Sequence, residues 1–423
     1  MSILNVNEIN PVGAANTITV NAANILASSS DLTLGKLNVS DIASGISTIS
    51  TTDLVVNGNN YPTTGALSNR RININGAMQV AQRGTSFTGV NATAYHCDRY
   101  ELYYQNSSAA FTVTQSTDTP DGFGKSLKID VTTADTSIAS NEEIKLVHKI
   151  EGFDVQRIIK GTASAVPITL SFYAKSTRTG TYVVELYDRD NGRDVSASYT
   201  ISNTNWNRYE LTYPADTGGS AFDDNNESSL EIQFWLVAGS AVQGGTLNTS
   251  WRTSSDGSSA TGQINFTDST INDWLITGIQ LEVGSKATEF EHRSFGDELA
   301  KCQRYYETSY PPGYSAGHNF NEVYPFNTSK PVSQNYIASD DAITSISYPF
   351  MVNKRANPTV IIYSAKDGAT GNALTYKGTG GTNINVALNV IQTREQQMML
   401  GCNLGATNQA SESYFHYTAE SEL

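Results

Sequence analysis

Residues 167–175, PITLSFYAK, decide the fold class because apolar and polar side chains alternate along the whole stretch. The apolar members are Ile168, Leu170, Phe172 and Ala174. Successive side chains of a β-strand point to opposite faces, so this spacing predicts a strand with one buried face in an antiparallel sheet. Residues 228–238, SSLEIQFWLVA, repeat the pattern and predict a second strand of the same kind.

Similar strand patterns recur on both sides of these two stretches. Between residues 99 and 293 they follow one another at the spacing of a β-sandwich. The sequence DNG at residues 190–192 predicts a hairpin, because Asn-Gly readily adopts the positive φ angles of a tight turn. A second group of strand patterns at residues 308–423 predicts a smaller C-terminal β-sandwich.

The segments outside the two sandwiches predict the remaining organisation of the chain. Ser294 can cap a short linker helix over residues 294–307, and residues 67–98 are expected to form a connector. Residues 1–66 contain short apolar bursts that cannot form a core in one copy. They are either disordered or wrapped around identical copies as a trimerisation and attachment segment, and the strand-like alternation favours the second interpretation.

Composition restricts the partners. The 423 residues carry a net charge of −14, which argues against nucleic acid and anionic membrane surfaces and leaves a neutral polar ligand open. The cysteines, Cys97, Cys302 and Cys402, have no spacing typical of a disulfide framework or a zinc site. The sequence also shows no secretory signal and no apolar run long enough to span a membrane.

Several motifs carry a family resemblance. INGAMQVAQRG (residues 74–84) and YHCDRYELYY (residues 95–104) resemble the opening of the carbohydrate-binding-type jelly rolls found in bacteriophage tail fibres. TGIQLEVGSKATEFEHRSFGDELAKCQRYYE (residues 277–307) resembles the sequence that ends such domains. YPFMVNKRANPTVIIYSA (residues 348–365) is similar to the small β domain that often follows. Residues 1–66 also resemble the virion-attachment segments of marine-phage fibres.

The resemblance implies an all-β, homotrimeric virion fibre with a central jelly roll. Its N-terminus would bind tail or neck proteins, and its distal domains would bind host surface glycans or lipopolysaccharide. Such a protein is made in the host cytoplasm and released by lysis. The expected function is host attachment without catalysis. A polysaccharide-degrading spike, which would need a pair of carboxylates, and a purely structural head or neck fibre are the alternatives.

Candidate ligand-binding residues follow from the chemistry of sugars, whose recognition combines aromatic faces with planar hydrogen-bonding groups. On strand faces opposite the apolar series, the candidates are Tyr173, Glu185, Tyr187, Gln233 and Trp235. Further candidates are Trp251 in a Gly/Ser-rich loop, and Tyr310 and Tyr314 in the C-terminal unit. The alternative is that this strand face packs under the loop 238–262 or against a neighbouring subunit.

Two acidic stretches are weighed as metal sites. DRDNGRD (residues 188–194) partly resembles a calcium loop but lacks its closing Glu, and the hairpin turn explains the same residues. FDDNNE (residues 222–227) could hold a structural calcium or form an acidic surface loop. We expect no cofactor, no catalytic residues and no metal-binding residues beyond that possible calcium.

Overall fold

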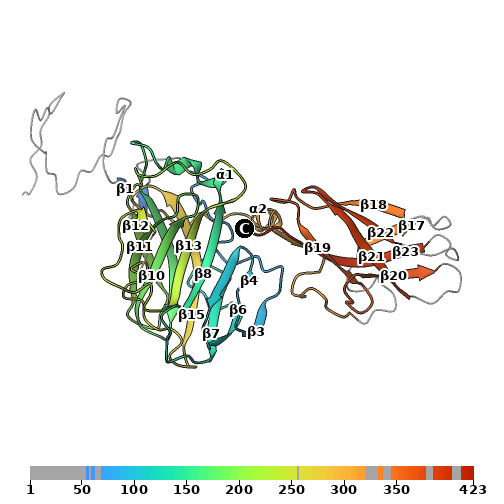
Figure 1. The fold of residues 1–423 in the computed structure, drawn as a ribbon, viewed down its shortest axis with the longest axis horizontal. Coiled ribbons are helices and arrows are strands. Elements are labelled where there is room, and N and C mark those ends of the chain that lie inside the picture. The colour runs from blue at the N-terminus through green and yellow to red at the C-terminus, as the bar shows by residue number, and fades with distance from the viewer. Residues whose placement is uncertain are drawn as a thin grey trace, which may run out of the picture. The chain divides into compact units, whose positions relative to one another are not determined.

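The computed structural model describes residues 54–56, 59–61, 68–254, 257–320, 332–336, 344–377, 384–402 and 411–423. Within these residues the chain is almost entirely β, and two antiparallel sheets face each other as a jelly-roll sandwich (Figure 1). The first, seven-stranded sheet has the order β14 (Arg252–Thr253), β11 (Arg193–Ile201), β10 (Gly180–Asp188), β13 (Ser228–Ala238), β8 (Glu143–Glu151), β5 (Tyr100–Gln105) and β4 (Ala94–Cys97). The second, six-stranded sheet has the order β12 (Asn207–Tyr213), β9 (Ile168–Ser176), β15 (Asp273–Val283), β7 (Ser126–Thr133), β6 (Ala110–Ser116) and β3 (Ser86–Val90).

The alternating residues predicted to be buried form the core between the two sheets. From β9, these are Ile168, Leu170, Phe172 and Ala174; from β13, they are Leu230, Ile232, Phe234 and Leu236. Each of these side chains is at most 2% exposed. The rings of Phe172 and Phe234 meet edge to face with centroids 5.2 Å apart, and this contact joins the sheets. The period-two interpretation of both stretches is therefore confirmed.

The predicted hairpin is also confirmed. Strands β10 and β11 pair in continuous register from Gly180↔Ile201 to Asp188↔Arg193. Gly192 in the connecting turn has a φ of 58°, in the left-handed region that favours glycine.

Part of the segment expected to be a connector contributes to the sandwich itself. Strands β3 and β4 lie within residues 67–98 and belong one to each sheet. Before them, the N–H of Ile72 donates to the carbonyl of Leu281 (2.9 Å). The buried Asn73 side chain donates to Ile279 O (2.8 Å) and accepts from the N–H of Leu281 (2.9 Å). This segment is thus bound to β15 by one backbone bond and two bonds of the Asn73 side chain, which strand periodicity does not reveal.

The predicted linker helix exists as α2 (Phe295–Gln303), and the Ser294 hydroxyl accepts the N–H of Asp297 as its cap (3.2 Å). It ends earlier than the expected 294–307, because Tyr306 and Glu307 already belong to a strand that pairs with the end of the chain. After it comes a second β unit around β23 (Ser411–Glu420), which pairs with β16 (Tyr306–Thr308), β17 (Val332–Tyr336), β19 (Thr359–Ser364) and β20 (Asn372–Lys377). Strands β21 (Ile384–Thr393), β22 (Gln397–Cys402) and β18 (Thr344–Pro349) extend that sheet.

The structure describes little of residues 1–66. Strands β1 (Leu54–Val56) and β2 (Asn59–Tyr61) form an antiparallel pair. The prediction of a trimerisation segment otherwise lies outside the described residues. A short helix, α1 (Gly152–Val155), follows β8. Among the described residues, no helix has the length and apolar character needed to cross a membrane.

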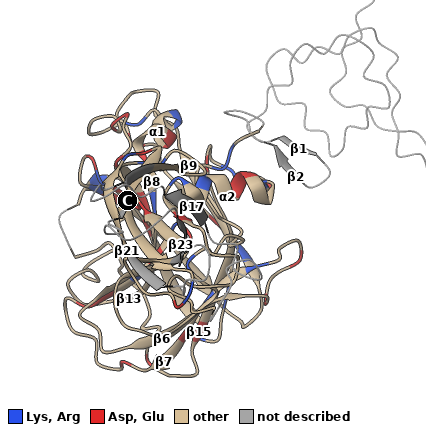
Figure 2. Cartoon of the chain, turned by 90° about the vertical axis from the view of Figure 1, so that its right-hand side faces the viewer, with Lys and Arg blue, Asp and Glu red and all other residues tan. Residues whose placement is uncertain are grey.

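Buried charge pairs tie the start of the sandwich to α2, which carries acidic residues in its first turn (Figure 2). Arg71 is 1% exposed, and its guanidinium pairs with the buried carboxylate of Glu298. The other oxygen of Glu298 accepts the N–H of Asn75 (2.6 Å). A buried cation that loses its only carboxylate partner is strongly destabilising, so this pair holds the segment and the helix together.

We predict that Glu298→Ala lowers the free energy of unfolding by about 3–5 kcal/mol, because it leaves the Arg71 guanidinium buried without its partner. Urea denaturation followed by tryptophan fluorescence reports on the sandwich, which contains Trp206, Trp235, Trp251 and Trp274. The neighbouring Asp297→Ala is the control, since Asp297 is exposed and should cost less than about 1 kcal/mol. Equal losses for the two variants would contradict this role.

Candidate functional site

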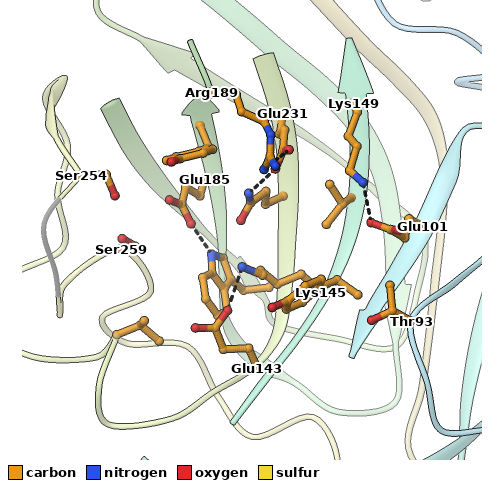
Figure 3. A pocket seen from close by; sticks show the side chains of 16 residues that line it. Thr93, Glu101, Glu143, Lys145, Lys149, Glu185, Arg189, Glu231, Ser254 and Ser259 are labelled. Atoms are coloured by element: carbon orange, nitrogen blue, oxygen red, sulfur yellow. Dashed lines mark hydrogen bonds and ion pairs between the residues drawn. The ribbon is translucent and has the colours of Figure 1, made fainter. Parts of the chain in front are cut away.

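A cleft of about 490 Å³ lies on the face of the seven-stranded sheet that points away from the core (Figure 3). Alternate residues of β5, β8, β10 and β13 form its floor, and the loop after β13 forms one wall. Its lining consists of Thr93, Glu101, Tyr103, Glu143, Lys145, Val147, Lys149, Glu185, Tyr187, Arg189, Glu231, Gln233, Trp235, Val242, Ser254 and Ser259.

Strand register arranges the floor in rows that cross the sheet. Tyr103 lies opposite Lys145, and Lys145 lies opposite Trp235, so these three make one row. The next row contains Glu101, Val147, Gln233 and Glu185, and a third contains Lys149, Glu231 and Tyr187. Directly opposed residues on one face are near neighbours, so each row is a continuous surface of contacting side chains.

Trp235 lies on the floor of the cleft and is only 2% exposed. Its Nε1–H donates to Glu185 Oε2 (3.0 Å), which fixes the orientation of the indole ring. The ring also packs in a small apolar cluster with Val183, Ala238 and Ala260, against which Val242 and Leu247 of the loop lie. Loop packing therefore accounts for part of this strand face, as the alternative interpretation expected, and the open part is the cleft.

Each positive charge of the lining has a carboxylate partner. Lys145 pairs with Glu143 at 2.9 Å, Lys149 pairs with Glu101 at 3.0 Å, and Arg189 pairs with Glu231 at 3.2 Å. Glu231 also accepts the side-chain N–H of Gln233 (2.7 Å). Because opposite charges are interleaved along the cleft, its electrostatics favour a neutral polar ligand over a strongly charged one.

Glu185 is the remaining carboxylate, and its environment is different. Burial raises its pKa from 4.5 to about 7, against the opposing effect of the Lys145 ammonium. The Asp194 carboxylate raises the pKa further, whereas the hydrogen bond from Trp235 lowers it. Desolvation therefore dominates, and at neutral pH the carboxyl of Glu185 exchanges between its protonated and ionised forms.

The structure thus brings four predicted residues together: Glu185, Tyr187, Gln233 and Trp235 line the same cleft. Tyr173 does not join them, because β9 belongs to the other sheet. Its ring instead contacts Phe123, with centroids 5.3 Å apart. Alternation along a strand identifies its outward side chains but not the sheet to which the strand belongs.

The other three candidates lie outside the cleft lining. Trp251 is half-buried against the sandwich core, and its Nε1–H donates to Pro214 O (2.9 Å). Tyr310 is 5% exposed and stacks on His416, with centroids 4.2 Å apart. Tyr314 is 39% exposed and lies beside Phe320, with centroids 4.9 Å apart.

Sequence reasoning missed the β5 and β8 side of the cleft. The stretches RYELYYQ (residues 99–105) and EIKLVHKI (residues 143–150) are among the strand patterns between residues 99 and 293, but the candidate ligand-binding residues do not include their outward side chains. Those residues include Tyr103, Lys145 and Lys149. The same period-two pattern could have found them, although only the sheet order places them beside β13.

The acidic stretch at residues 188–194 is engaged by cations of the protein. Asp188 is buried and pairs with Lys160 at 2.6 Å, and Asp194 is buried and pairs with Arg252 at 3.3 Å. In the part of the chain that the structure describes, no group of three or more His, Cys, Asp or Glu residues is placed to hold a metal ion.

We predict that Glu185→Gln stabilises the sandwich above pH 7 but not near pH 4.5. Because the folded-state pKa of about 7 lies above the unfolded value of 4.5, the proton contributes stability that is complete below pH 4.5 and lost as pH rises through 7. Gln keeps an oxygen for Trp235 and carries no charge. As pH rises between these values, the free energy of unfolding of the variant should therefore increase by on the order of 3 kcal/mol relative to that of wild type.

Urea denaturation of both proteins at pH 4.5 and pH 8 measures this gain. Glu143→Gln, which removes a less buried carboxylate from the same cleft, is the control. A Glu185→Gln effect that does not change with pH would show that burial of this carboxyl is not costly.

A scan of protein-family models and a search of curated proteins found no match. Among solved structures, the chain is similar to the family 11 carbohydrate-binding module of Clostridium thermocellum in complex with a β-1,3-1,4-mixed-linked tetrasaccharide. That similarity has 10% identity and a TM-score of 0.24, and covers 49% of this chain and 99% of the module. The chain is also similar to the xylan-binding domain CBM22-2 of Paenibacillus barcinonensis Xyn10C, with 16% identity and a TM-score of 0.24. This similarity covers 44% of this chain and 91% of that domain. These similarities are too low to assign a family or a ligand.

Proposed function

We propose that the protein binds a neutral glycan in the cleft of the seven-stranded sheet. The observation that carries this proposal is the composition of the floor. Half-buried rings of Tyr103 and Tyr187 lie among the planar groups of Gln233, Glu231 and Glu185. A sugar ring presents an apolar C–H face and a rim of hydroxyl groups, and this lining offers a partner to each.

The dimensions of the cleft support an oligosaccharide as the ligand. Tyr103 and Tyr187 stand on β5 and β10, with β8 and β13 between them. Three interstrand spacings, about 14 Å, separate the tyrosines across the sheet, and the four residues from Lys145 to Lys149 separate their rows by about 13 Å along the strands, so the two rings stand about 20 Å apart. The volume of about 490 Å³ lies within the range of small-molecule sites. The paired charges of the lining favour uncharged sugars, since an anionic ligand would meet four carboxylates.

We propose that this binding is not accompanied by catalysis. A glycosidase needs one carboxyl that delivers a proton and a second that acts across the scissile bond. Here Glu185, whose pKa of about 7 would suit a proton donor, is only 5% exposed and bound to Trp235, and the carboxylates that would have to act opposite it, Glu101, Glu143 and Glu231, pair with cations. The alternative of a polysaccharide-degrading spike is tested by incubating the protein with capsule or lipopolysaccharide, where shortened chains would favour it.

The more specific proposal is a homotrimeric fibre of a bacteriophage virion that attaches to host surface glycans. It rests on the sequence resemblance of the motifs at residues 74–104, 277–307 and 348–365. The expected contacts with tail or neck proteins fall on residues 1–66. The cleft supports the glycan part of this proposal, and a purely structural head or neck fibre is the alternative.

We predict that Tyr103→Ala and Tyr187→Ala each weaken binding of a neutral polysaccharide by about tenfold, because each removes one stacking surface worth about 1.4 kcal/mol. Affinity electrophoresis in gels containing a panel of neutral polysaccharides measures this retardation. The matched control is Tyr173→Ala, which removes a half-buried tyrosine from the outer face of the other sheet. Retardation that depends on Tyr173 instead would place the site on the six-stranded sheet.

We predict that the full chain is a trimer with three times the 45.7 kDa mass of one chain, because residues 1–66 can form a core only in several copies. Light scattering coupled to size exclusion measures the mass. Deleting residues 1–66 should abolish the trimer while the sandwich stays folded. A monomeric full-length protein would contradict the fibre proposal without affecting the glycan site.

A further inference from the structure

The first row of the cleft floor has an unusual arrangement, in which a lysine lies between two aromatic side chains (Figure 3). The ammonium of Lys145 is 4.3 Å from the ring centroid of Trp235 and 4.8 Å from that of Tyr103. Both distances are within the range of a cation–π contact, for which Trp is the strongest partner. The protein's own cation thus occupies the aromatic part of the cleft.

This ammonium lies over the ring of Trp235, which other contacts also bury. The indole N–H is bound to Glu185, and the apolar cluster with Val183 and Ala260 lies around the ring. Together with Lys145, these contacts leave Trp235 only 2% exposed. A sugar ring that stacks on Trp235 must therefore take the place of the ammonium.

Lys145 has a second partner that can accompany such a movement. Its ammonium pairs at 2.9 Å with Glu143, which stands two residues earlier on the same face of β8. The Glu143 side chain is 19% exposed, compared with 12% for Lys145. The ammonium can leave the indole ring and remain paired with this more exposed carboxylate of the neighbouring row.

We propose that Lys145 is a side-chain lid over Trp235 and the residue that sets the ligand specificity of the cleft. A neutral sugar ring displaces the ammonium from Trp235, and the lysine moves towards solvent with Glu143. Cationic ligands are excluded because the lysine already fills the aromatic position. The glycan part of this inference rests on the proposed function, whereas the occupied aromatic position does not.

Two variants test the lid with a neutral polysaccharide in affinity electrophoresis. Lys145→Ala should bind about tenfold more tightly than wild type, because no cation–π contact has to be broken. Lys145→Arg keeps a cation and should bind no more tightly than wild type. The control is Lys175→Ala, which removes a lysine paired with Asp118 outside the cleft. Weaker binding by Lys145→Ala would overturn the lid, because the ammonium would then contact the ligand.

A second probe tests the aromatic position without any glycan. Lys145→Ala leaves Tyr103, Trp235 and Glu143 around a vacated ammonium position, which suits a quaternary ammonium ion. Tetramethylammonium should therefore change the tryptophan fluorescence of Lys145→Ala saturably, and that of wild type should stay constant. An unresponsive Lys145→Ala protein would overturn the occupied position. If the ion binds but no polysaccharide binds either protein, the aromatic position stands and the proposed function fails.

Discussion

The register of β13 between β8 and β10 is the constraint on which both the core and the cleft depend. Between Leu230 and Leu236, even-numbered residues of β13, such as Phe234, point into the sandwich, and odd-numbered residues, such as Gln233 and Trp235, line the cleft. A shift of one residue would exchange the two sets and bury polar groups in the core. Burial of the apolar set therefore fixes which side chains of β13 face the cleft.

The same register explains the electrostatics of the floor. Cross-strand neighbours bring lysines and carboxylates of adjacent strands together, as in the pair of Lys149 and Glu101. These pairs neutralise the cleft of a chain whose net charge is −14. The buried Glu185 accepts the indole N–H of Trp235, and desolvation raises its pKa to about 7 despite this hydrogen bond. Together these groups give the cleft a polar lining with little net charge, which is the kind of surface that suits a neutral glycan.

Much of the fold and part of the cleft could be predicted from sequence. Alternation identified both faces of β9 and β13, and Ser294 identified the start of α2. Sequence could not place Tyr173, because its strand pattern is the same in either sheet. It also did not identify Lys145, because a lysine on an exposed strand face usually marks solvent. The role of Lys145 depends on cross-strand neighbours, and those follow from tertiary pairing and not from local pattern.

Fluorine NMR of protein labelled with 5-fluorotryptophan tests the central claim most directly, because the four tryptophans occupy four different environments. Trp235 lies in the cleft, Trp274 is buried in the core, Trp206 donates to Asp118, and Trp251 lies in the loop after β13. Titration with the neutral polysaccharide that is retained most strongly should shift the resonance of Trp235 and leave those of Trp206 and Trp274 unchanged. A shift of Trp206 with an unchanged Trp235 would contradict binding in the cleft.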